Sequence, residues 1–349
     1  MKTKRAFLGF FIAAAAMAVV LRIPHAIRAV NEGRDVPVLM YHGFADDPGN
    51  DVWTVSSFEF ERQMRELKDG GRTAITPNQL ALAAKGLFLL PAKPVVITMD
   101  DGFQDNVTIA EPIMRKYGMK GICYLIMSHI GDSPGTRSQY RGRDNLVWPE
   151  VREAIGRGTL SFGSHSISHS ANAELQSREV ASSRHLFHGK TGFKANAYCY
   201  PNGYAPDLIW EAVRHKHRFT TAMICTDTVF RFSCDADLYR IPRVSIYGGA
   251  HDFALDMVEW KNGGLSARAT NRGAPMPVRC LLRDRRTGRS FLSDGPPQRL
   301  AQGNSRRFAW KALPSDLPDD SLEVIVSEQN GLFTYGAPAS VPPRDSLLR

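Results

Sequence analysis

Two short clusters of acidic and imidazole side chains in this sequence have the composition of a metal-assisted catalytic site. Asp100 and Asp101 follow the apolar run Pro94–Met99 and precede a glycine, while His165 and His169 follow a second apolar stretch. Two imidazoles and one carboxylate suit zinc, and they leave coordination positions open for water and substrate. The second carboxylate would then be available to move protons.

The spacing within each cluster predicts how its side chains are presented. Consecutive strand residues face opposite ways, so Asp100 and Asp101 are expected to serve different tasks. His165 and His169 are expected on one face of a helical turn, because residues four apart are neighbours there. Each cluster also has a plainer interpretation, since aspartates often cap a following helix and histidine pairs are often incidental. Both clusters directly follow predicted strands, and this shared position favours a functional site over the plainer interpretations.

Apolar runs alternate with amphipathic stretches before Gly263. The strand-like runs are Val36–Tyr41, Val95–Met99, Gly121–Met127, Leu160–Phe162, Ala195–Tyr200 and Phe219–Ile224. The helical stretches are Phe58–Leu67, Asn106–Tyr117, Trp148–Arg157, Glu174–Phe187 and Pro206–His217. This alternation predicts an α/β fold with a parallel sheet, either doubly wound or closed into a barrel. Function is then expected at the carboxyl ends of the strands.

The pattern changes to short alternating segments after Gly263, which predicts a small all-β, sandwich-like domain. Those segments are Leu265–Thr270, Val278–Leu282, Phe308–Leu313 and Leu322–Val326. We therefore predict four regions: a targeting segment over 1–29, a catalytic domain over 30–262, the β-domain over 263–338, and a flexible tail over 339–349.

The amino terminus has the pattern of an export signal. Three basic residues among the first five precede the uninterrupted apolar run Ala6–Leu21. This run of 16 residues is shorter than the roughly 20 that span a bilayer. A cleaved signal peptide and an uncleaved anchor that keeps the protein at the membrane both stay open. Either predicts an exported protein, periplasmic, extracellular or anchored to the outer side of the cytoplasmic membrane.

Composition narrows the class of protein further. An apolar fraction of 43% and a charged fraction of 23% are those of a globular chain. The net charge of +9 favours anionic surfaces such as membranes or acidic glycans, but no nucleic-acid motif accompanies it, so no nucleic-acid partner is expected. The five cysteines lack CxxC or CxxH spacing, which argues against a structural zinc site or a thioredoxin-like motif. A Cys225–Cys234 disulfide and free thiols both remain open.

The two clusters together resemble the first two motifs of polysaccharide deacetylases with the NodB homology domain. The matching segments are Thr98-Met-Asp-Asp-Gly102 and His165-Ser-Ile-Ser-His169, within a likeness that covers Val36 to Tyr247. The segments Val36–His42 and Tyr198–Gly203 are similar to those of exported poly-β-1,6-N-acetylglucosamine deacetylases. The resemblance implies a distorted (β/α) barrel of the NodB type.

The resemblance also implies a reaction and roles in it. Asp100 would be the general base, while Asp101, His165 and His169 would bind a divalent ion, with zinc favoured over cobalt, nickel or iron. The reaction would be hydrolytic N-deacetylation of an N-acetylated polysaccharide, which releases acetate. A poly-N-acetylglucosamine-like exopolysaccharide is favoured ahead of peptidoglycan. The alternatives are a related hydrolase that cleaves another C–N bond in a small substrate, and a catalytically silent glycan-binding protein.

The chain departs from the family pattern at the residue that orients the base. Many members carry an arginine two residues before the proline of the third motif, where this chain has Cys199. Arg243 is our predicted substitute as the residue that orients Asp100. The alternative is that Arg243 is an exposed arginine at the end of a strand.

The general acid is the second departure. The Leu-x-His motif that supplies it in many members is missing from its expected place, so His42 or His251 is predicted to act instead, against the alternative that each is structural. Tyr200, Pro201 and Asn202 are expected to line the pocket for the acetyl group. A plain turn at this Pro-Asn-Gly sequence is the competing interpretation.

Overall fold

The computed structural model describes residues 22–249, 251, 253–261, 264–273, 275–314, 316–317, 319–328 and 330–343. Most of the predicted targeting segment therefore lies outside the described residues, and its remainder, 22–29, is helical. Within these ranges, no helix is long and apolar enough to cross a membrane. The described residues form two compact units, one within 1–43 and 68–245 and the other within 44–67 and 246–349.

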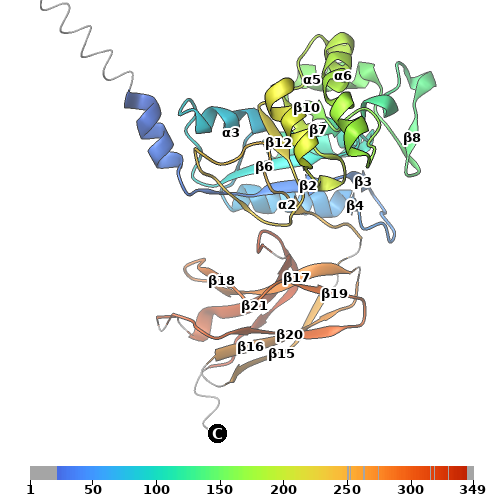
Figure 1. The fold of residues 1–349 in the computed structure, drawn as a ribbon. Coiled ribbons are helices and arrows are strands. Elements are labelled where there is room, and N and C mark those ends of the chain that lie inside the picture. The colour runs from blue at the N-terminus through green and yellow to red at the C-terminus, as the bar shows by residue number, and fades with distance from the viewer. Residues whose placement is uncertain are drawn as a thin grey trace, which may run out of the picture. The chain divides into compact units, whose positions relative to one another are not determined.

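The first unit is built on one parallel sheet of eight strands (Figure 1). The strand order is β12-β11-β10-β7-β6-β2-β14, and β5 also pairs with β6. The strands are β2 Val38–Tyr41, β5 Thr73–Ala74, β6 Pro94–Met99, β7 Gly121–Leu125, β10 Leu160–Ser164, β11 Ala197–Cys199, β12 Thr221–Met223 and β14 Val244–Ser245. The predicted α/β class is confirmed, and the curled sheet has the half-barrel form expected of the NodB fold.

Helices link consecutive strands and supply the apolar cover that buried parallel strands need. They are α3 Pro77–Ala84, η1 Asn106–Ala110, α4 Glu111–Lys116, α5 Trp148–Arg157, α6 Ala173–Thr191, α7 Asp207–Glu211 and η5 Ala212–Lys216. Trp148 of α5 meets Phe187 of α6 edge-on, with ring centroids 6.3 Å apart, and both rings are buried. Burial of such side chains contributes about 1.5–3 kcal/mol each, so this pair fixes the two helices together.

The strand register brings the carboxyl ends of three strands together. Met99 at the end of β6 pairs with Cys123 of β7, and Ser164 at the end of β10 pairs with both Leu125 and Tyr198. The residues that directly follow β6, β10 and β11 therefore lie along one edge of the sheet. This is the edge at which the sequence predicts function.

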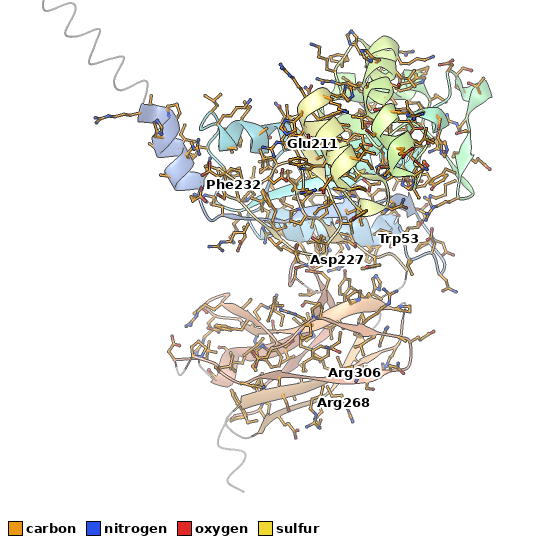
Figure 2. The ribbon with its side chains drawn as sticks, in the orientation of Figure 1. Trp53, Glu211, Asp227, Phe232, Arg268 and Arg306 are labelled. Atoms are coloured by element: carbon orange, nitrogen blue, oxygen red, sulfur yellow. The ribbon has the colours of Figure 1, made fainter. Side chains whose placement is uncertain are left out.

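The second unit contains two antiparallel sheets, which confirms the antiparallel β-structure predicted for the carboxyl-terminal region. One sheet has the order β15-β16-β20, with β15 Phe253–Lys261, β16 Gly264–Asn271 and β20 Ser305–Trp310. The other joins β17 Met276–Asp284, β18 Ser290–Leu292, β19 Gln298–Leu300, β21 Leu322–Glu328 and β22 Thr334–Ser340. Exposed arginines such as Arg268 and Arg306 extend from adjacent β16 and β20 (Figure 2).

The division into units differs from the predicted boundaries of 262 and 338. Strand β15 begins at Phe253 and pairs along its length with β16, which places it in the β unit. Residues 44–67, with helix α2 at Ser57–Asp69, also belong to this unit. Gly248 approaches this segment so closely that a Cβ there would lie 1.7 Å from the Thr54 carbonyl oxygen. At the other end, the Val341 N–H donates to the Leu322 carbonyl at 3.1 Å.

Candidate catalytic and metal site

Three of the predicted site residues form one group of potential metal ligands. Asp101, His165 and His169 each offer a ligand atom, and these atoms all lie within 4.8 Å of one another. The two imidazole rings have centroids 4.7 Å apart. A carboxylate and two imidazoles at this separation make a donor set that suits a divalent transition metal.

The backbone around the histidines is a loop, so the predicted helical turn is wrong. Residues 165–170 contain no helix, and Ser166 and His169 have left-handed backbones with φ of 67° and 53°. The Ser166 hydroxyl accepts the His169 N–H at 2.9 Å, which closes the loop. Buried Glu179 of α6 accepts the N–H groups of Ile167 and Ser168 at 3.3 and 3.1 Å. These bonds, rather than helical spacing, bring the two rings together.

The aspartates do not face opposite ways as strand alternation predicts. Strand β6 ends at Met99, and Asp101 and Gly102 both adopt left-handed φ, 73° and 77°. Position 102 favours glycine because of this positive φ, and a Cβ there would also lie 2.8 Å from a Leu125 methyl carbon. The turn brings both carboxylates towards His165, whose Nε2 lies 3.8 Å from Asp100 Oδ2 and 3.7 Å from Asp101 Oδ1.

Backbone strain is concentrated around this group. Seven non-glycine residues in the described part of the chain have positive φ, and five of them are site residues or their neighbours: Asp101, Arg141, Ser166, His169 and Asn202. Non-glycine residues in the left-handed region cost energy, and they persist where the surrounding structure holds them, commonly at functional sites. The strain therefore supports this sheet edge as the working surface.

The hydrogen bonding of His165 prepares it to bind a metal. Its Nδ1 lies 2.9 Å from the Cys199 carbonyl oxygen, which only accepts, so the proton sits on Nδ1 and Nε2 keeps its lone pair. A partner of this kind fixes the ring of a metal-binding histidine. Burial lowers the pKa of His165, and it lowers the pKa of His169 to about 4. Both rings are therefore neutral at pH 7, the form that binds metals.

Asp101 also suits metal binding, although its pKa is raised where those of the two histidines are lowered. Burial, followed by the charge of Asp100, raises the pKa of Asp101 to about 7. A carboxylate whose charge is this unfavourable is one that a nearby cation would stabilise strongly. The residues present thus fit a divalent ion, held by Asp101, His165 and His169.

Asp100 is held by a buried arginine. Arg243 donates from Nη1 to Asp100 Oδ1 at 2.7 Å and from Nη2 to Oδ2 at 2.8 Å, and also to the Thr98 hydroxyl at 3.2 Å. Its side chain is 1% exposed, so the alternative of an exposed strand-end arginine does not hold. Burial would raise the pKa of Asp100, but the charge of Arg243 and its hydrogen bonds hold that pKa well below its usual range.

Cys199 stands beside the same carboxylate. Its Sγ lies 3.7 and 3.6 Å from the two oxygens of Asp100, within reach of a thiol hydrogen bond. Burial raises the pKa of Cys199 well above its usual range, so the thiol is protonated and can donate. All five cysteines, including Cys225 and Cys234, are free thiols.

The two predicted general acids belong to different units. His42 is in the first, and burial lowers its pKa to about 4 while the charge of Asp100 acts in the opposite direction. Its carbonyl accepts the Asn106 side-chain amide at 2.7 Å. His251 is in the second unit, where its Nε2 lies 2.9 Å from the Tyr247 carbonyl oxygen. His42 is thus the candidate that shares an electrostatic environment with Asp100.

The predicted acetyl-pocket residues form a tight turn after β11. Tyr200 and Pro201 are buried, and the Tyr200 hydroxyl donates to the Tyr239 carbonyl at 3.0 Å. Asn202 is exposed and has φ of 59°. The hydroxyl of Tyr200 therefore serves packing, and Asn202 is the accessible member of the three.

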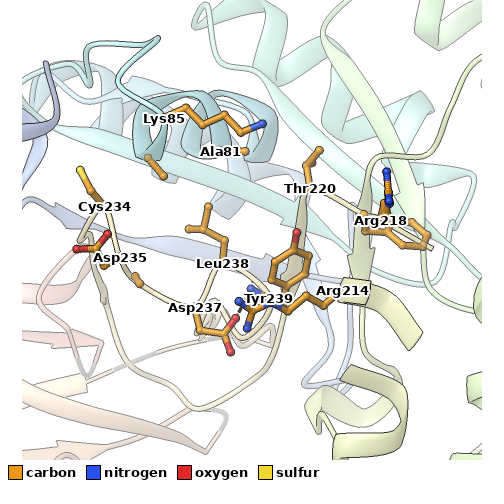
Figure 3. A pocket seen from close by; sticks show the side chains of 13 residues that line it. Ala81, Lys85, Arg214, Arg218, Thr220, Cys234, Asp235, Asp237, Leu238 and Tyr239 are labelled. Atoms are coloured by element: carbon orange, nitrogen blue, oxygen red, sulfur yellow. Dashed lines mark hydrogen bonds between the residues drawn. The ribbon is translucent and has the colours of Figure 1, made fainter. Parts of the chain in front are cut away.

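A separate hollow of about 570 Å³ lies at the amino-terminal end of β12 (Figure 3). Lys85, Arg214, Arg218 and Tyr239 are among the residues that line it. None of the predicted site residues contributes to this lining. The hollow lacks the convergent metal ligands of the sheet edge, so we assign the chemistry to that edge.

Sequence reasoning missed a hairpin beside the metal group. Strands β8 Gln139–Tyr140 and β9 Arg143–Asp144 place the Tyr140 ring 6.2 Å from the His169 ring. Arg141, at the turn, lies with its guanidinium carbon 5.4 Å from the Tyr140 ring centroid. The turn sequence Arg141-Gly142 was the available signal, but its position relative to the site depends on contacts distant in sequence.

Comparison with known proteins gives a consistent result. The polysaccharide deacetylase family model matches residues 90–220. YxkH of Bacillus subtilis (strain 168) is 29% identical over 218 residues, which cover 61% of this chain and 72% of YxkH. The poly-β-1,6-N-acetyl-D-glucosamine N-deacetylase of Staphylococcus epidermidis is 24% identical over 226 residues, 60% of this chain and 72% of that protein. The acetate complex of Streptococcus pyogenes deacetylase PplD, at 21% identity, covers 62% of this chain and 93% of its own with a TM-score of 0.54, which shows a shared fold.

Proposed function

We propose that this chain, whose residues 90–220 match the polysaccharide deacetylase family model, is a carbohydrate N-deacetylase that hydrolyses the acetamido groups of an extracytoplasmic glycan with one bound divalent metal ion. The observation that carries the proposal is the pairing of two unlike carboxylates at one sheet edge. Asp101 lies among neutral imidazoles, and Asp100 is kept ionised by Arg243.

Asp101, His165 and His169 would hold the metal, and zinc suits this donor set best. When bound, such an ion lowers the pKa of water from 15.7 towards about 7 and polarises the amide carbonyl. Asp100 is ionised at neutral pH, so it can accept the proton that the attacking water loses. Arg243 fixes the carboxylate for this task through both of its oxygens.

The reaction forms a C–O bond, breaks the C–N bond, and releases acetate and a free amine. The departing amine needs a proton. The pKa of His42, lowered by burial to about 4, makes it neutral in the resting site. The proton that Asp100 takes from the water balances the one that the departing amine gains. We assign His42, whose pKa the charge of Asp100 influences, to the delivery of that proton.

The turn after β11 offers a donor for the negative charge that develops on the carbonyl oxygen. The Tyr200 N–H already donates to the Met223 carbonyl oxygen at 3.2 Å, and the Gly203 N–H donates to the Tyr200 carbonyl oxygen at 2.9 Å. Pro201 has no N–H. Asn202 is an exposed residue, and its N–H is therefore our candidate, since fixed backbone donors stabilise such oxyanions well.

A poly-N-acetylglucosamine-like exopolysaccharide is the favoured substrate, because the Staphylococcus epidermidis relative is named for that activity. Peptidoglycan is second. We also propose an extracytoplasmic location, which the basic and apolar pattern of the first 21 residues supports.

Acetate release from a panel of N-acetylated glycans, before and after chelation and with metal restored, tests the proposal. We expect release that chelation abolishes and zinc restores. Release that is unaffected by complete metal removal would overturn the metal-dependent mechanism. Glycan binding without acetate release would instead support a silent binding protein, and recovery of the full-length protein in the cytosol would revive a small substrate.

A further inference from the structure

Four apolar side chains of the first unit lie at its surface on two segments of the chain. Ile23 and Val30 belong to the helix of residues 22–31, dark blue in Figure 1, and they are 50% and 52% exposed. Because seven residues make about two helical turns, both lie on one face of this helix. Leu87 and Leu89, in the loop after α3, are 62% and 55% exposed. Single exposed apolar residues are ordinary, whereas a group of them marks a contact surface.

The amino-terminal end of this helix meets the loop at Gly86. A Cβ at that position would lie 2.2 Å from the Pro24 carbonyl oxygen, so the two backbones are in close contact. Ile23 directly precedes Pro24, and Leu87 directly follows Gly86. These two exposed side chains therefore belong to the same part of the surface.

The carboxyl-terminal end of the helix is held by Asn31, which is fully buried. Its side-chain amide donates to the Phe88 carbonyl at 2.8 Å, and its side-chain oxygen accepts the Leu90 N–H at 2.9 Å. Phe88 and Leu90 pack into the core of the first unit, whereas Leu89 between them stays at the surface. Val30 directly precedes Asn31, so Val30 and Leu89 meet at this end.

These contacts join the four side chains into one surface, which we call the apolar patch: Ile23, Val30, Leu87 and Leu89. The segments that carry the patch, 22–31 and 85–93, contain four arginines and lysines and no acidic residue. Three of these cations, Arg22, Lys85 and Lys93, are exposed. Apolar side chains flanked by exposed cations are typical of a surface that binds anionic lipid, because lipid supplies both an apolar layer and negative headgroups.

The place of the patch in the chain also favours lipid over a protein partner. The apolar run Ala6–Leu21 ends directly before the helix, and only Arg22 separates that run from Ile23. Segments as apolar as this run partition into bilayers. A bilayer that holds the run must then lie beside the apolar patch, whereas a protein partner would not explain why the patch begins where the run ends.

We propose that the apolar patch lies in the surface of a lipid bilayer that contains anionic lipids, and that it holds the first unit there. Its aliphatic side chains enter the boundary between headgroups and acyl chains, while Arg22, Lys85 and Lys93 contact the lipid phosphates. This membrane contact goes beyond the proposed deacetylation, because it restricts the enzyme to glycan that lies close to the bilayer.

Leu89→Trp in the full-length protein is the test variant, because tryptophan suits membrane interfaces and an exposed position accepts the larger ring. The protein is reconstituted into vesicles of phosphatidylcholine and phosphatidylglycerol, and the emission of the wild-type tryptophans is subtracted. We expect blue-shifted emission that brominated phosphatidylcholine quenches. Bromines near the headgroup end of the acyl chains should quench more than bromines near the chain ends, because interfacial segments enter only about 5–10 Å.

Leu175→Trp is the matched control, since Leu175 is a leucine of α6 in the same unit and is 44% exposed. In the same vesicles its emission should be that of tryptophan in water, and bromine should not change it. Emission of Leu89→Trp that matches the control would overturn the inference, and so would equal quenching of both variants. A blue shift without quenching would show that protein, such as a second copy of this chain, covers the patch, which also overturns it. Acetate release is not measured here, so failure of this inference leaves the proposed function standing.

Discussion

Asp100 and Asp101 are adjacent and both buried, yet the two halves of the site to which they belong treat a negative charge in opposite ways. In the base half, Arg243 binds both oxygens of Asp100 and holds its pKa well below the usual range. In the metal half, burial and the charge of Asp100 raise the pKa of Asp101 to about 7. Similar burial therefore gives opposite results, and the difference is the presence of a built-in cation.

This difference indicates that the metal half, unlike the base half, depends on a positive charge that the protein itself does not supply. The base half is electrostatically complete, because Arg243 comes with the fold. The metal half contains neutral imidazoles around a carboxylate whose ionised form is unfavourable. Such a group is stabilised by a divalent ion, and its ligands bind best when deprotonated. The predictions below test this division.

The largest effect is expected when the metal half loses its charged ligand. Asp101→Asn should abolish stoichiometric zinc binding and reduce acetate release to background, because the amide is a far weaker ligand and the two imidazoles remain alone. Metal analysis of the purified protein, paired with the acetate assay, measures both effects. Asp132→Asn removes an exposed carboxylate elsewhere in the same unit and should keep both properties. Full metal content in Asp101→Asn would contradict the ligand assignment.

The matching change in the base half should separate metal content from activity. Asp100→Asn removes the proton acceptor but none of the proposed ligands. General-base catalysis typically contributes about 10²- to 10⁴-fold in rate, so activity should fall on that order. Zinc content should stay near that of the wild type. If Asp100→Asn loses its metal and Asp101→Asn keeps it, the roles of the two halves are reversed.

The sequence predicted which residues form the site better than it predicted the backbone geometry that brings them together. The apolar strand before Asp100 and the motif around His165 were sufficient to place both at one sheet edge. The backbone that joins them could not be predicted, because the left-handed turn at Asp101 and the Glu179 bonds to the histidine loop depend on local geometry and a distant helix. Arg243 was a candidate because this chain departs from the family pattern at Cys199. Its contact with Asp100 could not be predicted, because the two residues are 143 positions apart in sequence.

The fold shows the same limit. Continuous apolar runs identified every strand from β6 to β12 in the central sheet, since strands buried on both faces need such runs. The short hairpin at 139–144 was missed, because its few residues carry no hydrophobic period. The assignment of 44–67 to the second unit was also missed. It depends on contacts such as Arg62 over the Tyr335 ring, at 5.3 Å, which no local pattern reveals.

Removing the built-in cation of the base half should change stability more than metal content. Arg243→Met leaves Asp100 buried without its partner, and breaking a buried pair in this way typically costs about 3–5 kcal/mol. In the wild type, the lowered pKa of Asp100 gives stability that is present above its ordinary value near 3.8 and lost as pH falls. The difference in the free energy of unfolding should therefore be largest at neutral pH and shrink in acid.

Urea unfolding of the metal-free proteins at several pH values measures that difference. Arg178→Met, an exposed change on α6, is the control and should follow the wild type at every pH. A cost in Arg243→Met that does not change with pH would mean that lost packing, rather than an unpaired carboxylate, explains it.

The smallest expected effect is the pH dependence of metal affinity, and it tests the metal half directly. The pKa of Asp101 is about 7 in the metal-free protein, whereas that of His169 is about 4 and that of His165 is also lowered. Between pH 7 and pH 5 the proton therefore competes with the metal mainly at Asp101. Affinity should be level above about pH 7 and fall by up to about tenfold for each pH unit below it.

The same raised pKa means that the contribution of Asp101 to the stability of the metal-free protein is present below its ordinary value near 3.8 and is lost as pH rises through about 7. Lowering the pH should thus weaken zinc binding but make the metal-free protein more stable at Asp101, because the carboxyl group is then protonated. At neutral pH, bound zinc should stabilise the ionised carboxylate instead. Competitive zinc titrations from pH 5 to pH 8, with thermal unfolding of the metal-free protein at each pH, measure the two trends together. An affinity that is constant over this range would show that Asp101 is already ionised without the metal, and the contrast between the two halves would then lose its electrostatic basis.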